Sequence, residues 1–137
     1  MVELMRKLEP WFIPGRLTIL SELDEFGEII FVIQGTVALG FELNKNYTMC
    51  KKFENNCVVG AYGLTFNQRA AYNYKAISSC KGYFIRKNLW LELLENNPEI
   101  AVGLKHQILL DYLMKVRAKV EVKKKKMKEL FQKRADH

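Results

Sequence analysis

The sequence predicts an α+β fold in which an antiparallel β-barrel or jelly-roll-like sandwich is followed by C-terminal helices. Two observations lead to this prediction. As far as residue 85, short segments rich in β-branched and aromatic residues alternate with turn residues, and from residue 88 the apolar spacing becomes helical. The chain has 137 residues and is 49% apolar, which is enough to bury the core of one domain.

The first part of the chain predicts one short helix and six strands. Val2–Leu8 is expected to be helical and to end before Pro10, and Pro14-Gly15 predicts a turn. The strands are expected at Leu17–Leu20, Glu28–Ile33, Thr36–Leu43, Tyr47–Phe53, Tyr72–Ile77 and Cys80–Ile85. Turn residues such as Asn44–Asn46 lie between them. This close alternation is typical of antiparallel barrels and sandwiches.

The last third of the chain predicts two helices. Asn88–Glu95 has leucines at helical spacing and is broken at Asn96-Asn97-Pro98. A second helix is expected from Glu99 to about Lys133, because no proline interrupts this stretch. Its apolar residues recur at three- and four-residue intervals, which predicts a seam that packs on the β-structure and then meets a partner helix, at Leu109, Leu113, Val116, Val120, Met127 and Leu130.

The net charge of +7 is concentrated at the C-terminus. Residues 115–137 hold 10 of the 22 basic residues and 3 of the 15 acidic ones, so residues 1–114 are balanced with 12 of each. We therefore divide the chain into a neutral domain, 1–114, and a basic extension of the last helix, 115–137. No apolar run approaches the roughly 20 residues of a membrane span, and no secretory signal is visible.

The residues predict neither catalysis nor metal binding. Cys50, Cys57 and Cys80 have no CxxC or His-paired spacing, so they are expected to be reduced structural thiols in the cytosol. No nucleophile–base pair or paired carboxylates with a pocket can be identified. We expect no catalytic residue, no metal ligand and no cofactor.

The segment from Gly60 to Ala71, GAYGLTFNQRAA, is the strongest functional motif. Gly60 and Gly63 permit positive φ or close approach of the backbone to a ligand. A short helical turn with free N–H groups beside one arginine suits a cyclic phosphate. The predicted site residues are Gly60, Ala61, Tyr62, Gly63, Leu64, Arg69, Ala70 and Ala71. Alternatively, the glycines belong to an ordinary loop and Arg69 is a surface arginine.

With this motif, the chain resembles the cyclic-nucleotide-binding domain family, whose phosphate-binding cassette ends in RAA. Three other segments are similar to the family: Phe12–Leu17, Ile29–Val37 (IIFVIQGTV), and Phe84-Ile85 with the leucines and Asn97-Pro98-Glu99 that follow. Together the matches cover about residues 8–115. The resemblance implies a β-roll with a short N-terminal helix, an internal cassette helix and two C-terminal helices, and it implies cAMP or cGMP as the ligand.

Two positions depart from the family pattern. Binding members have an acidic residue directly after the cassette glycine, where it accepts a hydrogen bond from the ribose 2′-hydroxyl, but this chain has Ala61. Losing such a bond costs on the order of 1.5–3 kcal/mol. Tyr72 occupies a position where a small hydroxyl residue is common, so we expect its ring to crowd the mouth of the pocket. Tyr62 and Phe66 are expected to anchor the cassette helix in the core.

The basic extension has three interpretations: a solvated helix end, attraction to anionic lipid headgroups, or nonspecific nucleic-acid affinity. Too few residues follow the seam for a helix-turn-helix, so we predict no specific binding of nucleic acid.

The resemblance implies a cytoplasmic regulatory domain, on the cytosolic face of a cyclic-nucleotide-regulated potassium or cation channel, with weak or altered ligand binding. Its last helix would close over the base through residues near Leu104, Ile108 and Leu109. The alternative is a non-binding module that forms homo-oligomers or contacts a membrane through its basic helix.

Overall fold

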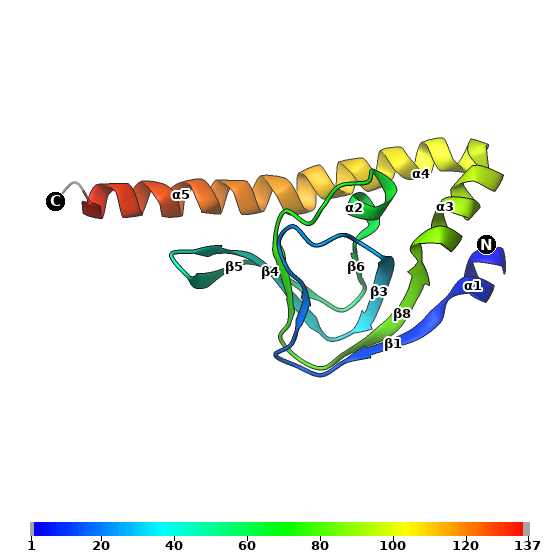
Figure 1. Cartoon of the computed structure of the whole chain (residues 1–137), viewed down its shortest axis with the longest axis horizontal. Helices are drawn as coiled ribbons and strands as arrows, with labels where there is room; N and C mark the ends of the chain where they lie inside the picture. The colour runs from blue at the N-terminus through cyan, green and yellow to red at the C-terminus, as the bar shows by residue number, and fades with distance from the viewer. Residues whose placement is uncertain (1, 136–137) are drawn as a thin grey trace.

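The protein, seen here as a computed structural model that describes residues 2–135, is a β-roll lying beneath one long helix (Figure 1). The strands are β1 (Glu9–Ile13), β2 (Thr18–Leu20), β3 (Glu28–Gln34), β4 (Thr36–Leu43), β5 (Asn46–Glu54), β6 (Cys57–Val59), β7 (Asn73–Ala76) and β8 (Cys80–Arg86). They form two antiparallel four-stranded sheets, ordered β1-β8-β3-β6 and β2-β7-β4-β5. The α+β prediction is confirmed, as two sheets of a roll rather than a closed barrel.

Turn residues set the connections as the sequence predicts. Asn44 and Lys45 join β4 to β5 with φ of 53° and 66°. A tight hairpin needs positive φ at both central residues, and asparagine tolerates this conformation well. The hairpin is paired along its whole length, from Leu43 opposite Asn46 to Thr36 opposite Glu54.

Two strands, β1 and β6, were not predicted. β1 is an edge strand that pairs with β8 alone, which is where a proline such as Pro10 can be tolerated. β6 has only three residues and pairs with β3 at the other edge of the same sheet. The proline removes the strand signal of β1, and β6 is shorter than the four residues from which a pattern identifies a strand.

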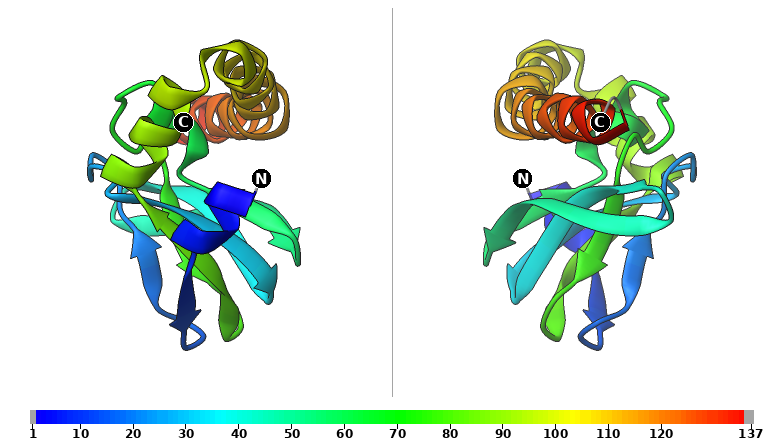
Figure 2. Two further views of the ribbon diagram at one scale, coloured as in Figure 1. Left: turned by 90° about the vertical axis from the view of Figure 1, so that its right-hand side faces the viewer. Right: turned by 90° about the vertical axis from the view of Figure 1, so that its left-hand side faces the viewer.

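Helices enclose one end of the roll. They are α1 (Val2–Lys7), α2 (Ala61–Thr65), α3 (Lys87–Asn96), α4 (Pro98–Asp111), η1 (Tyr112–Arg117) and α5 (Ala118–Ala135). The last three form one continuous rod, which crosses above the sheets in both end views (Figure 2). The predicted long helix is therefore confirmed, but η1 is a π-helical segment of six residues that the sequence did not indicate.

One apolar core joins the two sheets to the helices. Its strand residues include Ile29, Val32, Val37, Leu39, Phe41 and Ile85, all nearly inaccessible to solvent, and the helices add Leu64, Trp90, Leu94, Ala101 and Val120. Of the predicted seam, Val120 is fully buried, while Leu130 is exposed. Cys80 is buried in this core, and Cys50 and Cys57 are half-buried free thiols.

None of the helices within residues 2–135 is long and apolar enough to cross a membrane.

Candidate functional site

A cavity of about 490 Å³ lies between the roll, the short helix α2 and the long helix. Ligand pockets of small-molecule-binding proteins begin at about 300 Å³, so this one can hold a nucleotide-sized molecule. Its lining is largely apolar and includes Phe26, Ile29, Val37, Val59, Tyr74 and Trp90 from the roll and α3. The functional groups at its edge come from the cassette and from the long helix.

Helix α2 forms the cassette end of the cavity. Gly60 is the N-cap, with φ of 94°, a conformation in which a side chain would be strained. Because the helix begins at Ala61, the N–H groups of Ala61, Tyr62 and Gly63 have no carbonyl partner within it. Gly63 packs so closely on Phe26 that an added Cβ would lie 2.1 Å from the ring. Both glycines are therefore required by the local structure.

The cassette divides into cavity-lining residues and core residues. Gly60, Ala61, Tyr62, Gly63, Arg69 and Ala71 line the cavity. Leu64 and Ala70 point elsewhere and are each 2% exposed, within the core. Six of the eight predicted site residues are therefore brought together at one cavity, and the other two hold the cassette in place.

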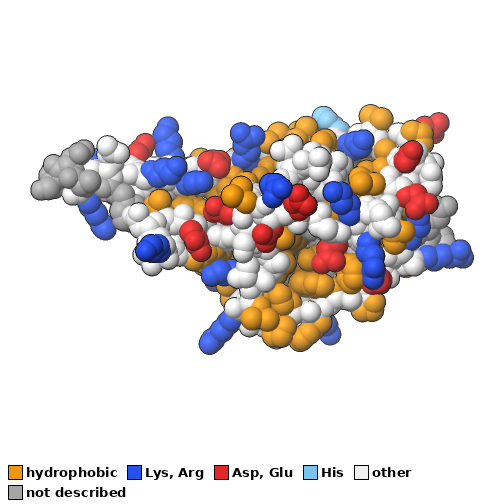
Figure 3. All heavy atoms as spheres, viewed as in Figure 1, with side chains coloured by type: hydrophobic (Ala, Val, Ile, Leu, Met, Phe, Trp, Pro, Cys, Tyr) orange, Lys and Arg blue, Asp and Glu red, His pale blue; other side chains and the backbone are white. Residues whose placement is uncertain are grey.

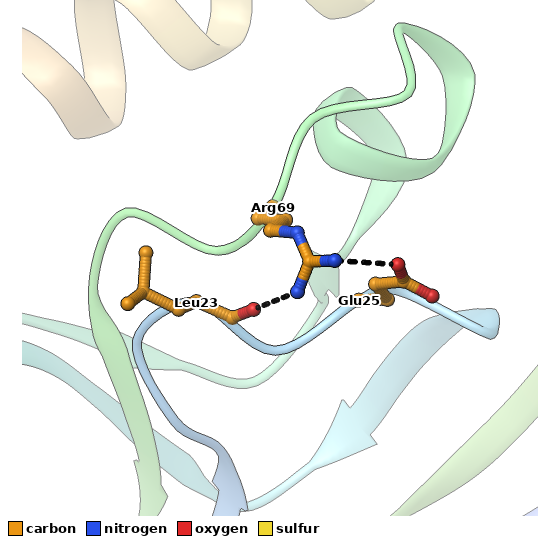
Figure 4. A network of polar contacts seen from close by, with 3 residues as sticks. All are labelled: Leu23, Glu25 and Arg69. Carbon is orange, nitrogen blue, oxygen red and sulfur yellow. Dashed lines mark hydrogen bonds and ion pairs between the residues drawn. The ribbon is translucent and has the colours of Figure 1, made fainter.

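Arg69 is fixed by the loop between β2 and β3 (Figure 4). Its guanidinium donates one hydrogen bond to the carbonyl oxygen of Leu23 at 3.0 Å and another to the Glu25 carboxylate at 2.9 Å. The backbone reinforces this contact, because the Ala70 N–H donates to Asp24 O at 2.9 Å and the Leu23 N–H donates to Ala70 O at 2.8 Å. The Glu25 carboxylate, which sequence reasoning missed, therefore offsets part of the Arg69 charge and occupies one side of its guanidinium.

The long helix supplies the opposite wall. Leu104, Ile108, Tyr112 and Val116 line the cavity, together with the charged pair Asp111 and Lys115. The Asp111 and Lys115 side chains form an ion pair at 3.6 Å. Of the three residues predicted to lie on a closing helix, Leu104 and Ile108 face the cavity, whereas Leu109 is not among its lining residues within residues 2–135.

Two tyrosines join the cassette to this wall. The rings of Tyr62 and Tyr112 are stacked, with centroids 3.9 Å apart and planes 5° apart. Burial, followed by the proximity of Tyr62, raises the pKa of Tyr112 above its usual value. The expectation that Tyr62 anchors the cassette in the core is wrong, since its ring contacts the long helix; Phe66 packs beside it with centroids 5.3 Å apart.

Tyr72 does not crowd the cavity mouth, contrary to prediction. Its side chain is 2% exposed and its hydroxyl donates a hydrogen bond to Glu121 of α5 at 2.9 Å. Within residues 2–135, it is not among the residues that line the cavity. Tyr72 instead ties the roll to the start of the basic helix.

The cavity is apolar, with the Arg69 guanidinium and the first N–H groups of α2 at one end and the long helix across it. Cys57 lines the cavity, but burial raises the pKa of its thiol to about 11, so it is neutral at pH 7. The described residues contain no cluster of His, Cys, Asp or Glu that could hold a metal ion. This arrangement suits binding of an anionic small molecule rather than nucleophilic chemistry.

No protein-family model matches the chain, and no curated protein matches it. Solved structures do. The C-linker/CNBHD of zELK channels, crystallised in the presence of cAMP, superposes with a TM-score of 0.67 and 22% identity over 80% of this chain and 55% of that one.

Two other structures come from different kinds of protein. Thermus thermophilus catabolite activator protein gives a TM-score of 0.70 and 16% identity over 88% of this chain and 57% of that one. The regulatory domain of Toxoplasma gondii PKA with cAMP gives a TM-score of 0.61 and 14% identity over 66% of this chain and 36% of that one.

This chain spans only about a third to three-fifths of each of these chains. At such identities the likeness concerns the fold, which is that of the cyclic-nucleotide-binding β-roll.

Proposed function

We propose that this chain is a regulatory domain that binds a cyclic nucleotide, cAMP or cGMP, with weak or altered affinity. The observation that carries the proposal is the position of Arg69 and the first turn of α2 at one end of the apolar cavity. A cyclic phosphate would accept hydrogen bonds from the N–H groups of Ala61, Tyr62 and Gly63 and would pair with the Arg69 guanidinium.

Two features of the site would weaken binding. Ala61 lines the cavity but has no acceptor for the ribose 2′-hydroxyl. Glu25 already pairs with Arg69, so the phosphate would meet a guanidinium whose charge is partly offset by a carboxylate. The base would occupy the apolar part of the cavity beneath Leu104, Ile108 and Tyr112, whose helix would relay the bound state.

The regulated protein in this proposal is a potassium or cation channel, with the domain on its cytosolic face. The support is the sequence resemblance and the likeness to the zELK channel structure, whose identity of 22% is the highest of the three comparisons. Catabolite activator protein superposes equally well, so the fold alone does not distinguish channels from transcription regulators.

The alternative is a module that binds no nucleotide and acts through its helices, as a homo-oligomer or against a membrane. The Arg69–Glu25 ion pair and the stacked Tyr62–Tyr112 pair favour it, because both fill positions that a ligand would use.

Isothermal titration of the purified chain with cAMP and with cGMP distinguishes the nucleotide-binding domain from the non-binding module. We expect saturable heat that is lost in Arg69→Ala and kept in Arg134→Ala, since Arg134 is an exposed residue of α5 that carries the same charge. A folded sample that gives no heat with either nucleotide at millimolar concentration would exclude the nucleotide-binding function.

A further inference from the structure

A basic surface is formed jointly by the hairpin strand β5 and the helix α5. It consists of Lys51 on β5 and of Lys119, Lys123 and Lys126 on α5, which lie on one side of the helix. The two elements are in contact, because the Lys123 ammonium donates a hydrogen bond to the Met49 carbonyl oxygen of β5 at 2.8 Å. Figure 3 shows blue side chains along α5 and at the hairpin beneath it, and Figure 1 shows α5 extending past the roll.

Within residues 2–135, no ion pair neutralises the positive charges of this surface, because none includes a lysine of α5 or β5. Of the two acidic residues on α5, Glu121 accepts the hydrogen bond from the Tyr72 hydroxyl. Lys51 and Lys119 lie so close that repulsion from Lys119 lowers the pKa of Lys51.

Holding two ammonium groups side by side is unfavourable unless an anion lies against both. The excess positive charge of the chain lies in residues 115–137, so the attraction for an anion is directed to the end of the molecule that carries α5. Lys51 extends this basic surface from the helix onto the hairpin strand β5.

The composition of this face favours lipid over nucleic acid. All four of its basic residues are lysines, which act as point charges, whereas arginine is preferred for bidentate recognition of phosphates and bases. Apolar side chains are exposed on the same helix, with Val122 55% and Leu130 53% accessible. Because α5 is otherwise strongly polar, attraction between its lysines and anionic headgroups would carry the binding, and these two side chains would only add to it.

We propose that this basic surface docks the domain on a membrane leaflet that contains anionic lipids. Docking places the lysine ammonium groups against lipid phosphates and carboxylates, and Val122 and Leu130 reach the interface. The proposal does not depend on nucleotide binding, since none of these residues lines the cavity.

Co-sedimentation of the whole chain with vesicles tests it. One set of vesicles is pure phosphatidylcholine and the other contains one-fifth phosphatidylserine, in 100 mM salt. The test variant is Lys51→Gln with Lys119→Gln, and the control is Lys81→Gln with Lys105→Gln, which removes the same charge from exposed positions on β8 and α4.

We expect binding to the anionic vesicles only, with loss at 500 mM salt. A lysine near an anionic surface contributes about a fivefold change in partitioning, so the test variant should bind at least tenfold more weakly and the control less than threefold. Circular dichroism establishes that both variants are folded.

Other outcomes overturn the proposal. These are equal binding to neutral vesicles, equal loss in the two double variants, or no vesicle binding at all. Tight binding of a labelled 20-base-pair duplex that anionic vesicles do not displace would assign the surface to nucleic acid instead.

Discussion

The two halves of the long C-terminal helix differ in what they contact. The first half, α4 with η1, covers the cavity with Leu104, Ile108 and Tyr112. The second half, α5, contacts the roll mainly through Val120 and Met127 and is otherwise exposed and rich in lysine. One helix therefore carries a ligand-facing surface and a charged surface, joined at η1. Substitutions in the first half should therefore affect the cavity, and substitutions in the second half should affect the packing of α5 on the roll and the charged surface.

The largest effect is expected at the point where α5 is anchored. Val120 is fully buried, so Val120→Asp places a carboxylate in the core and should lower the free energy of unfolding by about 3 kcal/mol or more. Leu130→Asp introduces the same group on an exposed position of the same helix and should change it by less than about 0.5 kcal/mol. Urea denaturation measures both. Equal effects would mean that α5 is not packed on the roll.

The hydrogen bond between Tyr72 and Glu121 is the second link between the roll and α5. Tyr72→Phe removes the donor and should destabilise the chain by about 1.5 kcal/mol, the usual range for a bond to a charged group. Glu121→Gln keeps an acceptor and should cost less. Tyr83→Phe alters an exposed tyrosine and serves as the control. If Tyr72→Phe lowers the free energy of unfolding no more than Tyr83→Phe does, this link is contradicted.

The same tyrosine predicts a pH dependence. Burial, followed by the hydrogen bond to Glu121, raises the pKa of Tyr72 above 10 in the folded chain. Above pH 10 the unfolded chain loses this proton while the folded chain keeps it, so stability falls as the pH rises. In thermal melts from pH 9 to 11, the melting temperature of Tyr72→Phe should fall less with rising pH than that of the parent. An equal fall in the two proteins would be inconsistent with this assignment.

A smaller effect is expected where the first half of the helix meets the cassette. A double-mutant cycle of Tyr62→Leu and Tyr112→Leu should give a coupling energy of about 0.5–1.5 kcal/mol, the range for stacked aromatic pairs. Denaturation of the parent, the two single variants and the double variant supplies the four values. A coupling near zero would show that the rings do not stack in solution.

The smallest change is expected in ligand affinity. Glu25→Gln removes the carboxylate that pairs with Arg69, and because exposed ion pairs contribute about 0–1 kcal/mol, nucleotide affinity should rise by up to about fivefold. Titration calorimetry with cAMP and cGMP measures it. Glu22→Gln in the same loop serves as the control, and an equal rise in that variant would indicate a general effect of charge.

The sequence predicted the parts of this fold that depend on local patterns. Six strands, the cassette turn and the long helix follow from periodicity, glycine and proline. The strands β1 and β6 were missed because Pro10 and a length of three residues remove the local signal.

The site was predicted less completely, because its contacts join residues far apart in the sequence. Arg69 and Glu25 are 44 residues apart, and Tyr72 and Glu121 are 49 apart. No pattern in either segment indicates such a partner. The position of Tyr72 suggested a bulky group at the cavity, but its ring lies where α5 crosses the segment before β7, and that contact is not visible in the sequence.

The π-helical segment η1 joins the two halves of the long helix and determines which changes of chain length they tolerate. A π-turn commonly accommodates one additional residue within an α-helix while leaving the flanking turns on their original faces. Deleting a single residue between Tyr112 and Arg117 should therefore shorten the rod without rotating Ile108 away from the cavity or Val120 away from the core. A second deletion would rotate α5 by about 100° relative to the lid and carry Val120 out of the core, so this turn tolerates a change of one residue and no more.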